Sequence, residues 1–146
     1  MDIRSFQEKD LQACVETFIT IFSAEPWCDE WTTERATAYI QQFISTPGFY
    51  GVLAIEEEVV IGLALGNKKI WWQGDELFIH EFGVHPQFEG RGIAKALLQH
   101  LEQYVRAEQL SAITLSTQYD VPAFEFYLHN GFRASEKTRF LFKNIK

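Results

Sequence analysis

A glycine-containing turn between an apolar run and an amphipathic run constrains the fold of this chain more than any other feature. Residues 84–94 read VHPQFEGRGIA, and they follow a β-rich run from Glu76 to Val84. Apolar residues then recur at helical spacing, which predicts a strand, a tight turn and a helix over about 92–108. The N–H groups at a helix start lack intrahelical partners, and the helix dipole adds partial positive charge there. The turn is therefore typical of an anion site, often for phosphate, where glycines let a ligand approach the backbone.

Two better-known phosphate-binding loops do not fit this turn. The dinucleotide fingerprint G-x-G-x-x-G starts at Gly90 and Gly92, but Lys95 stands where the third glycine should be. The P-loop pattern G-x-x-x-x-G-K-[ST] has no match in the chain. The spacing alone therefore leaves both a phosphate site and an ordinary strand-to-helix turn open.

The same residues resemble the acetyl-CoA-binding segment of the GNAT N-acetyltransferase superfamily, whose signature is Q/R-x-x-G-x-G/A. The last three positions of the signature are matched by Gly92, Ile93 and Ala94, but Glu89 stands at the first position, where the family has Gln or Arg. A carboxylate would repel a pyrophosphate. We therefore expect backbone amides to bind the phosphates and Glu89 to face solvent. The resemblance implies acetyl-CoA as co-substrate, and the residues expected at its site are Phe82, Gly83, Val84, Glu89, Gly90, Arg91, Gly92, Ile93, Ala94 and Asp120.

A second segment with the same resemblance lies downstream. Residues 123–132 read AFEFYLHNGF and are similar to the family's A-x-x-x-Y-x-x-x-G-F segment. The resemblance implies that the Tyr127 hydroxyl protonates the departing CoA thiolate or hydrogen-bonds to its sulfur. Phe124 and Phe126 leave simple packing of Tyr127 open as the alternative. Asp120 stands where the family often has Asn, which is a second departure from its pattern.

Composition narrows the class of protein. The chain has 146 residues, 47% of them hydrophobic, which is enough for one domain over residues 1–146 with its own core. Thirteen basic and twenty acidic side chains give a net charge of −7, which argues against nucleic acid and is compatible with a cationic substrate. No apolar run approaches the ~20 residues of a membrane span, and the N-terminus does not resemble a signal peptide.

The two cysteines point to the compartment. Cys14 and Cys28 have no metal-ligand spacing with histidine and no disulfide-framework pattern, so we expect no metal, a reducing environment and a cytoplasmic location.

The order of elements predicts an α/β fold with a mixed sheet, βααβββαβαβ. Residues 76–117 form a parallel crossover unit, and the remaining strands form an antiparallel meander. The resemblance implies a GNAT-like sheet that splays at the end of the central strand and leaves backbone groups for the pantetheine arm of CoA. The expected strands are 1–6, 49–55, 59–69, 76–84, 112–117 and one or two within 132–142. The expected helices are one that opens at residue 8 and ends before the loop at 25–31, 33–45 with Thr32 or Thr33 as its N-cap, 92–108, and 121–130 with Gly131 as its C-cap.

Glu81 is the candidate general base. A carboxylate in the run FIHEFGV is unusual for a buried strand, and burial raises a carboxyl pKa toward a value suited to deprotonating an amine. The alternative is a glutamate at the sheet face that reaches solvent. His80 is the other possible base, but it should point to the opposite face unless a bulge intervenes, and we expect it to be packed in the core.

The acceptor amine is expected to meet the loop EPWCDEW, residues 25–31. Its aromatic and acidic side chains suit an ammonium group. A hydrophobic loop anchor with capping acids explains the same composition equally well. Trp71 and Trp72 could line the far wall of the acceptor site or contact another protein, and the sequence does not decide between the two. The acceptor-site residues are expected to be Trp27, Asp29, Glu30 and Trp31.

Together these features predict an N-acetyltransferase that moves acetyl directly from acetyl-CoA to a primary amine in a ternary complex. A backbone N–H near residues 82–84 is the expected donor to the developing oxyanion. The expected acceptor is a small cationic molecule, similar to a polyamine or an aminoglycoside. A lysine or N-terminus of a protein, or a CoA-binding module without turnover, remains open. An unpaired edge strand would also permit a homodimer.

Overall fold

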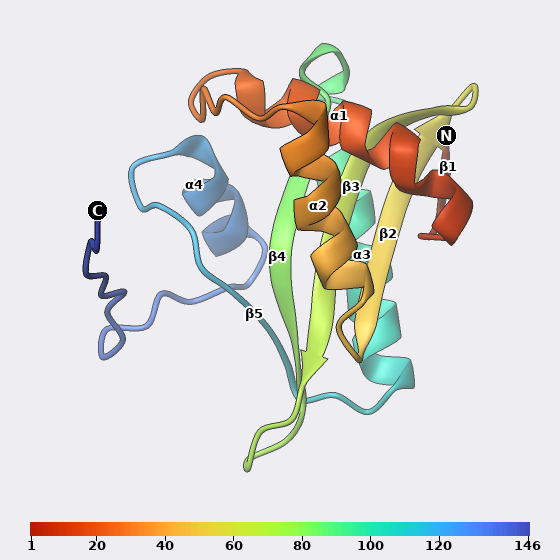
Figure 1. The fold of residues 1–146 in the computed structure, drawn as a ribbon. Coiled ribbons are helices and arrows are strands. Elements are labelled where there is room, and N and C mark those ends of the chain that lie inside the picture. Colours follow the sequence, from red (N-terminus) through yellow and green to blue (C-terminus); the bar gives the residue numbers. More distant parts are fainter. The chain divides into compact units, whose positions relative to one another are not determined.

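The computed structural model describes residues 1–146, which fall into two compact units, 1–116 and 117–146. Each unit is described by itself. The elements of the first unit are β1 (Asp2–Ser5), a 3₁₀ turn (Glu8–Asp10), α1 (Leu11–Ser23), α2 (Thr33–Ile44), β2 (Phe49–Glu56), β3 (Val59–Lys69), β4 (Glu76–Val84), a second 3₁₀ turn (Pro86–Phe88), α3 (Ile93–Ala107) and β5 (Ala112–Leu115), as Figure 1 shows. The second unit contains α4 (Pro122–His129).

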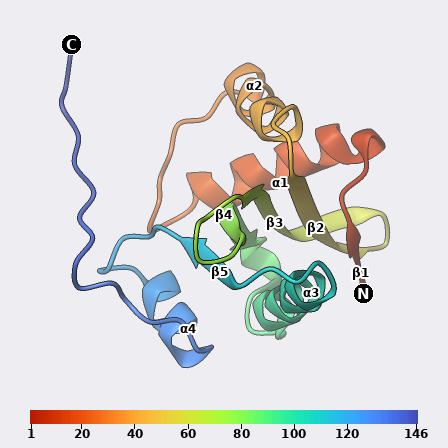
Figure 2. The ribbon, with the colours of Figure 1, turned by 90° about the horizontal axis from the view of Figure 1, so that it is seen from below.

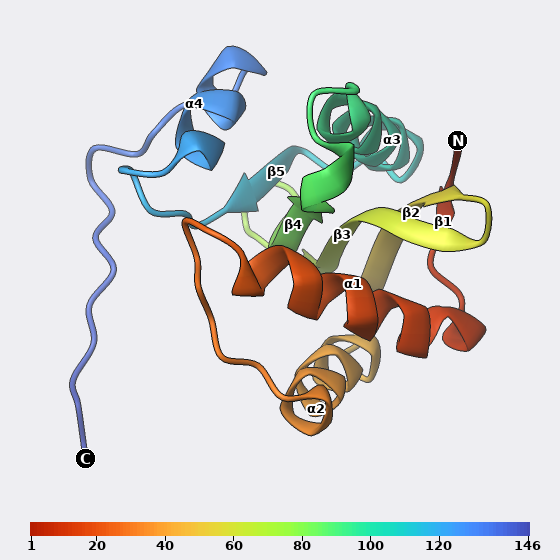
Figure 3. The ribbon, with the colours of Figure 1, turned by 90° about the horizontal axis from the view of Figure 1, so that it is seen from above.

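The first unit is a five-stranded mixed sheet in the order β1-β2-β3-β4-β5. Neighbouring strands are antiparallel except for β4 and β5, which run parallel. Helices α1 and α2 lie on one face of the sheet and α3 on the other, as Figures 2 and 3 show. Each face buries its own apolar cluster, one around Phe18 and Ile40 and the other around Leu97 and Leu101. The α/β fold with a mixed sheet is therefore confirmed.

The sheet splays at the end of its central strand. The parallel ladder pairs Glu76–Ile79 of β4 with Ala112–Leu115 of β5, but β4 continues to Val84. The last five residues of β4 therefore have no partner strand on the β5 side, and β5 diverges from them (Figure 1). This is the splay that the resemblance implied.

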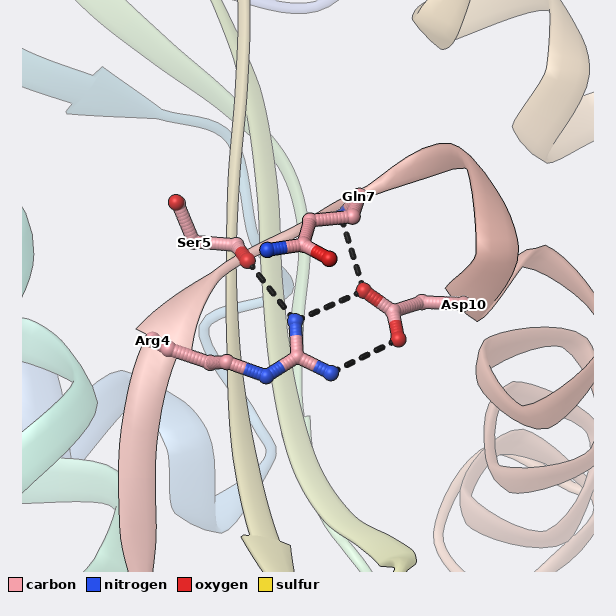
Figure 4. Close-up of polar contacts among 4 residues, drawn as sticks. All are labelled: Arg4, Ser5, Gln7 and Asp10. Atoms are coloured by element: carbon pink, nitrogen blue, oxygen red, sulfur yellow. Dashed lines mark hydrogen bonds and ion pairs between the residues drawn. The ribbon is translucent and has the colours of Figure 1, made fainter.

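A charged cluster fixes the entry to α1. The Arg4 guanidinium donates to both carboxylate oxygens of Asp10 at 2.8 Å, and the Gln7 N–H donates to the same carboxylate at 2.7 Å (Figure 4). Asp10 is 7% exposed, so the bidentate partner offsets the cost of its burial. These bonds hold the pKa of Asp10 below its usual range, chiefly through the hydrogen bond from Arg4. The contact joins β1 to the helix layer.

The predicted strand within residues 132–142 does not form. The chain after α4 has no regular secondary structure, and Phe140, Leu141 and Phe142 are 85%, 87% and 75% exposed. Alternating apolar residues suit a strand, but a strand exists only where its N–H and C=O groups pair with a neighbour. The observed order therefore ends at α4.

Candidate active site

The glycine turn opens α3 with two residues in the left-handed region. Gly90 has φ +80° and Gly92, which caps the helix, has φ +77°. Residues with a Cβ rarely adopt this conformation. A Cβ added at either glycine would meet no protein atom within 4 Å. The glycines therefore keep open a space in front of the backbone that side chains would otherwise fill.

The first backbone N–H groups of α3 follow directly after these glycines. The first helical hydrogen bond of α3 runs from the Ala96 N–H to the Gly92 carbonyl at 3.1 Å, and no side chain caps the helix start. The N–H groups of Ile93, Ala94 and Lys95 consequently have no intrahelical acceptor. With the helix dipole behind them, they suit a phosphate group.

The two charged side chains of the turn do not obstruct it. Glu89 is exposed, in agreement with the expectation that it faces solvent. Arg91 forms a bidentate ion pair with Glu56 at 2.9 and 3.0 Å, and its guanidinium lies 5.4 Å from the Phe88 ring centroid. The Arg91 side chain thus ties the turn to the end of β2.

A β-bulge reshapes the middle of β4. Leu65 of β3 pairs with Glu81, and the next β3 residue, Gly66, pairs with Ile79, so His80 is the extra residue. A bulge breaks the alternation of side chains along a strand. The side chains of His80 and Glu81 both reach α2 as a result, one through a ring contact and the other through a hydrogen bond. The two residues were expected on opposite faces unless a bulge intervened, and the bulge is the exception that applies here.

Glu81 accepts a hydrogen bond of 2.6 Å from the Tyr39 hydroxyl to its Oε1 atom. Burial raises the pKa of the Glu81 carboxyl to about 7, the negative charge of Asp29 acts in the same direction, and the hydrogen bond from Tyr39 opposes both. A carboxyl with such a pKa exchanges a proton readily at neutral pH.

His80 is a packed residue, as expected. Its ring stacks on Phe43 with centroids 4.2 Å apart, and its Nε2 atom lies 3.0 Å from Asn67 Oδ1. Burial lowers the pKa of the imidazole, which favours the neutral form. His80 therefore supports α2 against the sheet.

Two of the four expected acceptor residues, Trp31 and Asp29, join Tyr39, the residue that bonds to Glu81. Trp31 stacks on Tyr39 with centroids 4.9 Å apart, and its Nε1–H donates to Asp29 Oδ2 at 3.3 Å. The other two expected residues do not join this group, since Trp27 packs against Phe22 and Glu30 is exposed. Tyr39 was missed as a site residue because its role depends on a contact with a residue 42 positions away. Its helical spacing from Phe43 indicated only an inward-facing side chain.

The second unit contains the two remaining expected residues. Tyr127 of α4 is buried and packs against Phe126 and Phe132, with ring centroids 5.6 and 5.3 Å away. Asp120 is exposed in the turn before α4. Gly131 ends the helix at φ +92°, as predicted. The roles of Tyr127 and Asp120 rest on the resemblance alone.

The structure contains no group of three or more His, Cys, Asp or Glu side chains arranged to hold a metal ion. None of its helices has both the length and the apolar character that crossing a membrane requires.

Comparison with known proteins defines the class. The model of the acetyltransferase (GNAT) family matches residues 11–132. Acetyltransferase ECA0875 of Pectobacterium atrosepticum is 31% identical over 121 residues, which cover 82% of this chain and 78% of that protein.

Solved structures share the fold. A probable acetyltransferase superimposes with a TM-score of 0.82 at 18% identity, covering 100% of this chain and 99% of the other. The aminoglycoside N-acetyltransferase AAC(6')-Iy, solved with CoA, gives 0.77 at 18% identity, covering 97% and 93%.

This chain belongs to the GNAT acetyltransferase family. It is an acetyl-CoA-dependent N-acetyltransferase.

Proposed function

We propose that this protein acetylates a primary amine of a small cationic molecule, similar to a polyamine or an aminoglycoside, by direct transfer in a ternary complex. The observation that carries the proposal is the environment of Glu81. This carboxyl lies beyond the point where β5 leaves β4 and accepts a hydrogen bond from Tyr39. Trp31 stacks on Tyr39, and Asp29 accepts a hydrogen bond from Trp31. The arrangement combines a proton acceptor with aromatic and anionic surface, which suits an amine.

In the proposed reaction, Glu81 takes a proton from the acceptor ammonium, and the neutral amine then attacks the thioester carbonyl. The pKa of about 7 makes Glu81 a base strong enough for this step while leaving much of it ionised at neutral pH. Backbone N–H groups between Phe82 and Val84 are the proposed donors to the oxyanion. Much of the rate would come from holding amine and thioester together.

Acetyl-CoA would be bound largely by backbone. The open space at Gly90 and Gly92 and the N–H groups at the start of α3 fit a pyrophosphate. The splayed end of β4 is the proposed site for the pantetheine arm. The resemblance further supports Tyr127 as the acid that protonates the CoA thiolate.

Three observations support a cationic small molecule as the acceptor. The chain carries a net charge of −7, and Asp29 lies close enough to raise the pKa of Glu81. Fold neighbours include the aminoglycoside acetyltransferase meta-AAC0020, solved with sisomicin, with a TM-score of 0.77 at 17% identity. An acidic, aromatic site would hold one ammonium while another reacts.

An acceptor panel tests the proposal. Thiol release from acetyl-CoA is measured with spermidine, an aminoglycoside, a lysine peptide and a neutral amine at low and moderate salt. We expect the polycations to be the best acceptors and to lose activity as salt rises, because long-range attraction is screened over roughly 8–10 Å at physiological ionic strength.

Each of the other outcomes would overturn a different part of the proposed function. Preference for the lysine peptide would indicate a protein acetyltransferase. Preference for the neutral amine would rule out the cationic acceptor. Acetyl-CoA binding without release of thiol for any amine would indicate a CoA-binding module.

A further inference from the structure

We propose that Tyr39 is a positioning residue that fixes the Glu81 carboxyl for proton transfer and selects which of its oxygens acts. The inference rests on the proposed function, because it assigns Tyr39 to the same proton transfer. It goes beyond that function by giving α2 a part in catalysis.

The Tyr39 hydroxyl is held in place through its ring. The ring stacks on Trp31 at 4.9 Å, meets the edge of Phe43 at 4.6 Å and packs against Phe18 at 5.8 Å between centroids. These contacts anchor the ring to the loop before α2, to α2 itself and to α1. A phenol with so little freedom can direct its O–H at one acceptor, and that acceptor is Glu81 Oε1 at 2.6 Å.

The hydrogen bond distinguishes the two carboxylate oxygens. Oε1 accepts from Tyr39, whereas Oε2 takes part in no hydrogen bond. No fully buried side-chain nitrogen or oxygen of the protein lacks a partner, so Oε2 is not completely enclosed by the protein. The oxygen that remains available to take a proton from an acceptor amine is therefore Oε2.

Within residues 1–116, the other groups packed near Glu81 do not take over this role. The loop before α2 contributes the carboxylate of Asp29, which repels the ionised form of Glu81. Neighbouring strand β3 places Leu65 opposite Glu81, and α1 faces β4 with Ile21 and Phe22. His80 on β4 is occupied by Asn67. Within residues 1–116, no Lys or Arg side chain forms an ion pair with Glu81, and the hydrogen bond to its carboxyl comes from Tyr39.

The proposal predicts a shift with a defined sign. A donor to the ionised carboxyl lowers its pKa, so the Tyr39 hydroxyl opposes the rise that burial causes. Tyr39→Phe keeps the ring and removes only this donor. The pKa of Glu81 should then rise by about one unit. The acid limb of kcat/KM should move to higher pH by the same amount.

The experiment compares three variants of the full chain. Tyr39→Phe removes the donor, and 3-fluorotyrosine at position 39 strengthens it, because fluorine makes the phenol more acidic. Tyr50→Phe is the matched control, since Tyr50 is also partly buried but stacks on Tyr104 of α3. The ionisation of Glu81 is followed by NMR of ¹³C-labelled glutamate carboxyls, assigned with Glu81→Gln. The pH profile of kcat/KM is measured with the best acceptor of the panel.

We expect the Glu81 titration and the acid limb to move up together in Tyr39→Phe, down together with 3-fluorotyrosine and not at all in Tyr50→Phe. An unchanged Glu81 titration in both position-39 variants would overturn the inference while leaving Glu81 as the base. A shifted Glu81 titration with an unchanged pH profile of kcat/KM would also overturn the inference, because the bond from Tyr39 would then affect the pKa of Glu81 without affecting the reaction. If Glu81→Gln kept the same acid limb as well, the proposed base itself would be wrong. The NMR titration needs no acceptor, so failure of the Tyr39 inference can be distinguished from failure of Glu81 as the proposed base.

Discussion

The glycine turn and the surroundings of Glu81 are built in opposite ways. The turn is one continuous segment, and its proposed binding groups are backbone N–H groups beside Gly90 and Gly92. The surroundings of Glu81 come from a loop, a helix and a bulged strand, and every contact is made by a side chain. The first region is open to a ligand without further change. The second adjusts the protonation of one carboxyl through neighbours far away in the sequence.

This difference in construction assigns cofactor binding to the glycine turn and proton transfer to the surroundings of Glu81. A backbone cradle can hold a phosphate whatever side chains surround it, so departures such as Glu89 are tolerated when they face solvent. A pKa depends on each neighbouring dipole and charge, so single substitutions near Glu81 should alter rate and pH dependence. The predictions below test this division, from the largest effect to the smallest.

Glu81→Gln should lower kcat by about 100- to 10,000-fold, because the glutamine cannot take the proton from the ammonium. The acid limb of the pH profile should disappear with it. Steady-state kinetics from pH 5.5 to 9 measure both, and calorimetry should show acetyl-CoA affinity close to that of the wild type. A near-wild-type rate across this range would move the chemistry away from Glu81.

The same substitution should stabilise the folded chain at high pH. Glu81 has a raised pKa in the folded state, so the folded chain binds a proton more tightly than the unfolded chain between pH 4.5 and about 7. Stability of the wild type therefore falls as pH rises through this window, and the full cost is present above pH 7. Glu81→Gln removes the cost and should gain roughly 3 kcal/mol at pH 8. Urea unfolding at pH 4.5 and 8 measures the gain.

Glu30→Gln is the control for this effect, because its carboxylate is exposed. It should show no comparable pH-dependent gain. An equal gain in both variants would attribute the effect to net charge rather than to burial of Glu81.

Gly92→Val should weaken acetyl-CoA binding by about 5- to 100-fold, because its side chain would enter the space proposed for the pyrophosphate and the turn would shift to relieve a backbone strain of roughly 1–3 kcal/mol. The fold should survive, because the added Cβ meets no protein atom. Gly92→Asn is the control, since asparagine tolerates the left-handed conformation and should lose less affinity. Titration calorimetry with acetyl-CoA measures both. Unchanged affinity in folded Gly92→Val would exclude the turn as the phosphate site.

Asp29→Asn should raise KM for a polycationic acceptor by no more than about fivefold, because exposed ion pairs are weak. It should also move the acid limb of kcat/KM to lower pH, since the charge of Asp29 raises the pKa of Glu81. Glu30→Gln is the matched change one residue away and should affect KM less. Equal effects of the two substitutions at every salt concentration would show that only net charge matters.

The sequence alone determined most of the local structure and one of the two regions. The limits of β3 and β4, a threonine cap of α2 at 32 or 33, the Gly131 end of α4 and the glycine turn followed from patterns within a few residues. Such features are readable because backbone conformation at glycines, caps and turns is set by nearby residues. The exposure of Glu89 was expected because its carboxylate would repel the pyrophosphate that the resemblance implies.

Only the tertiary structure decided what depends on distant partners. The bulge at His80 depends on the register between β3 and β4, and it is what brings His80 and Glu81 to the same helix. The bond from Tyr39 to Glu81 joins residues 42 positions apart, so no local pattern predicts it. The predicted strand within 132–142 does not form for the same reason, since its local pattern does not show whether another strand will pair with it. A strand, a bulge or a carboxyl with a raised pKa forms only where a segment distant in the sequence supplies the partner. The tertiary structure therefore decides these features, because it alone brings the two segments together.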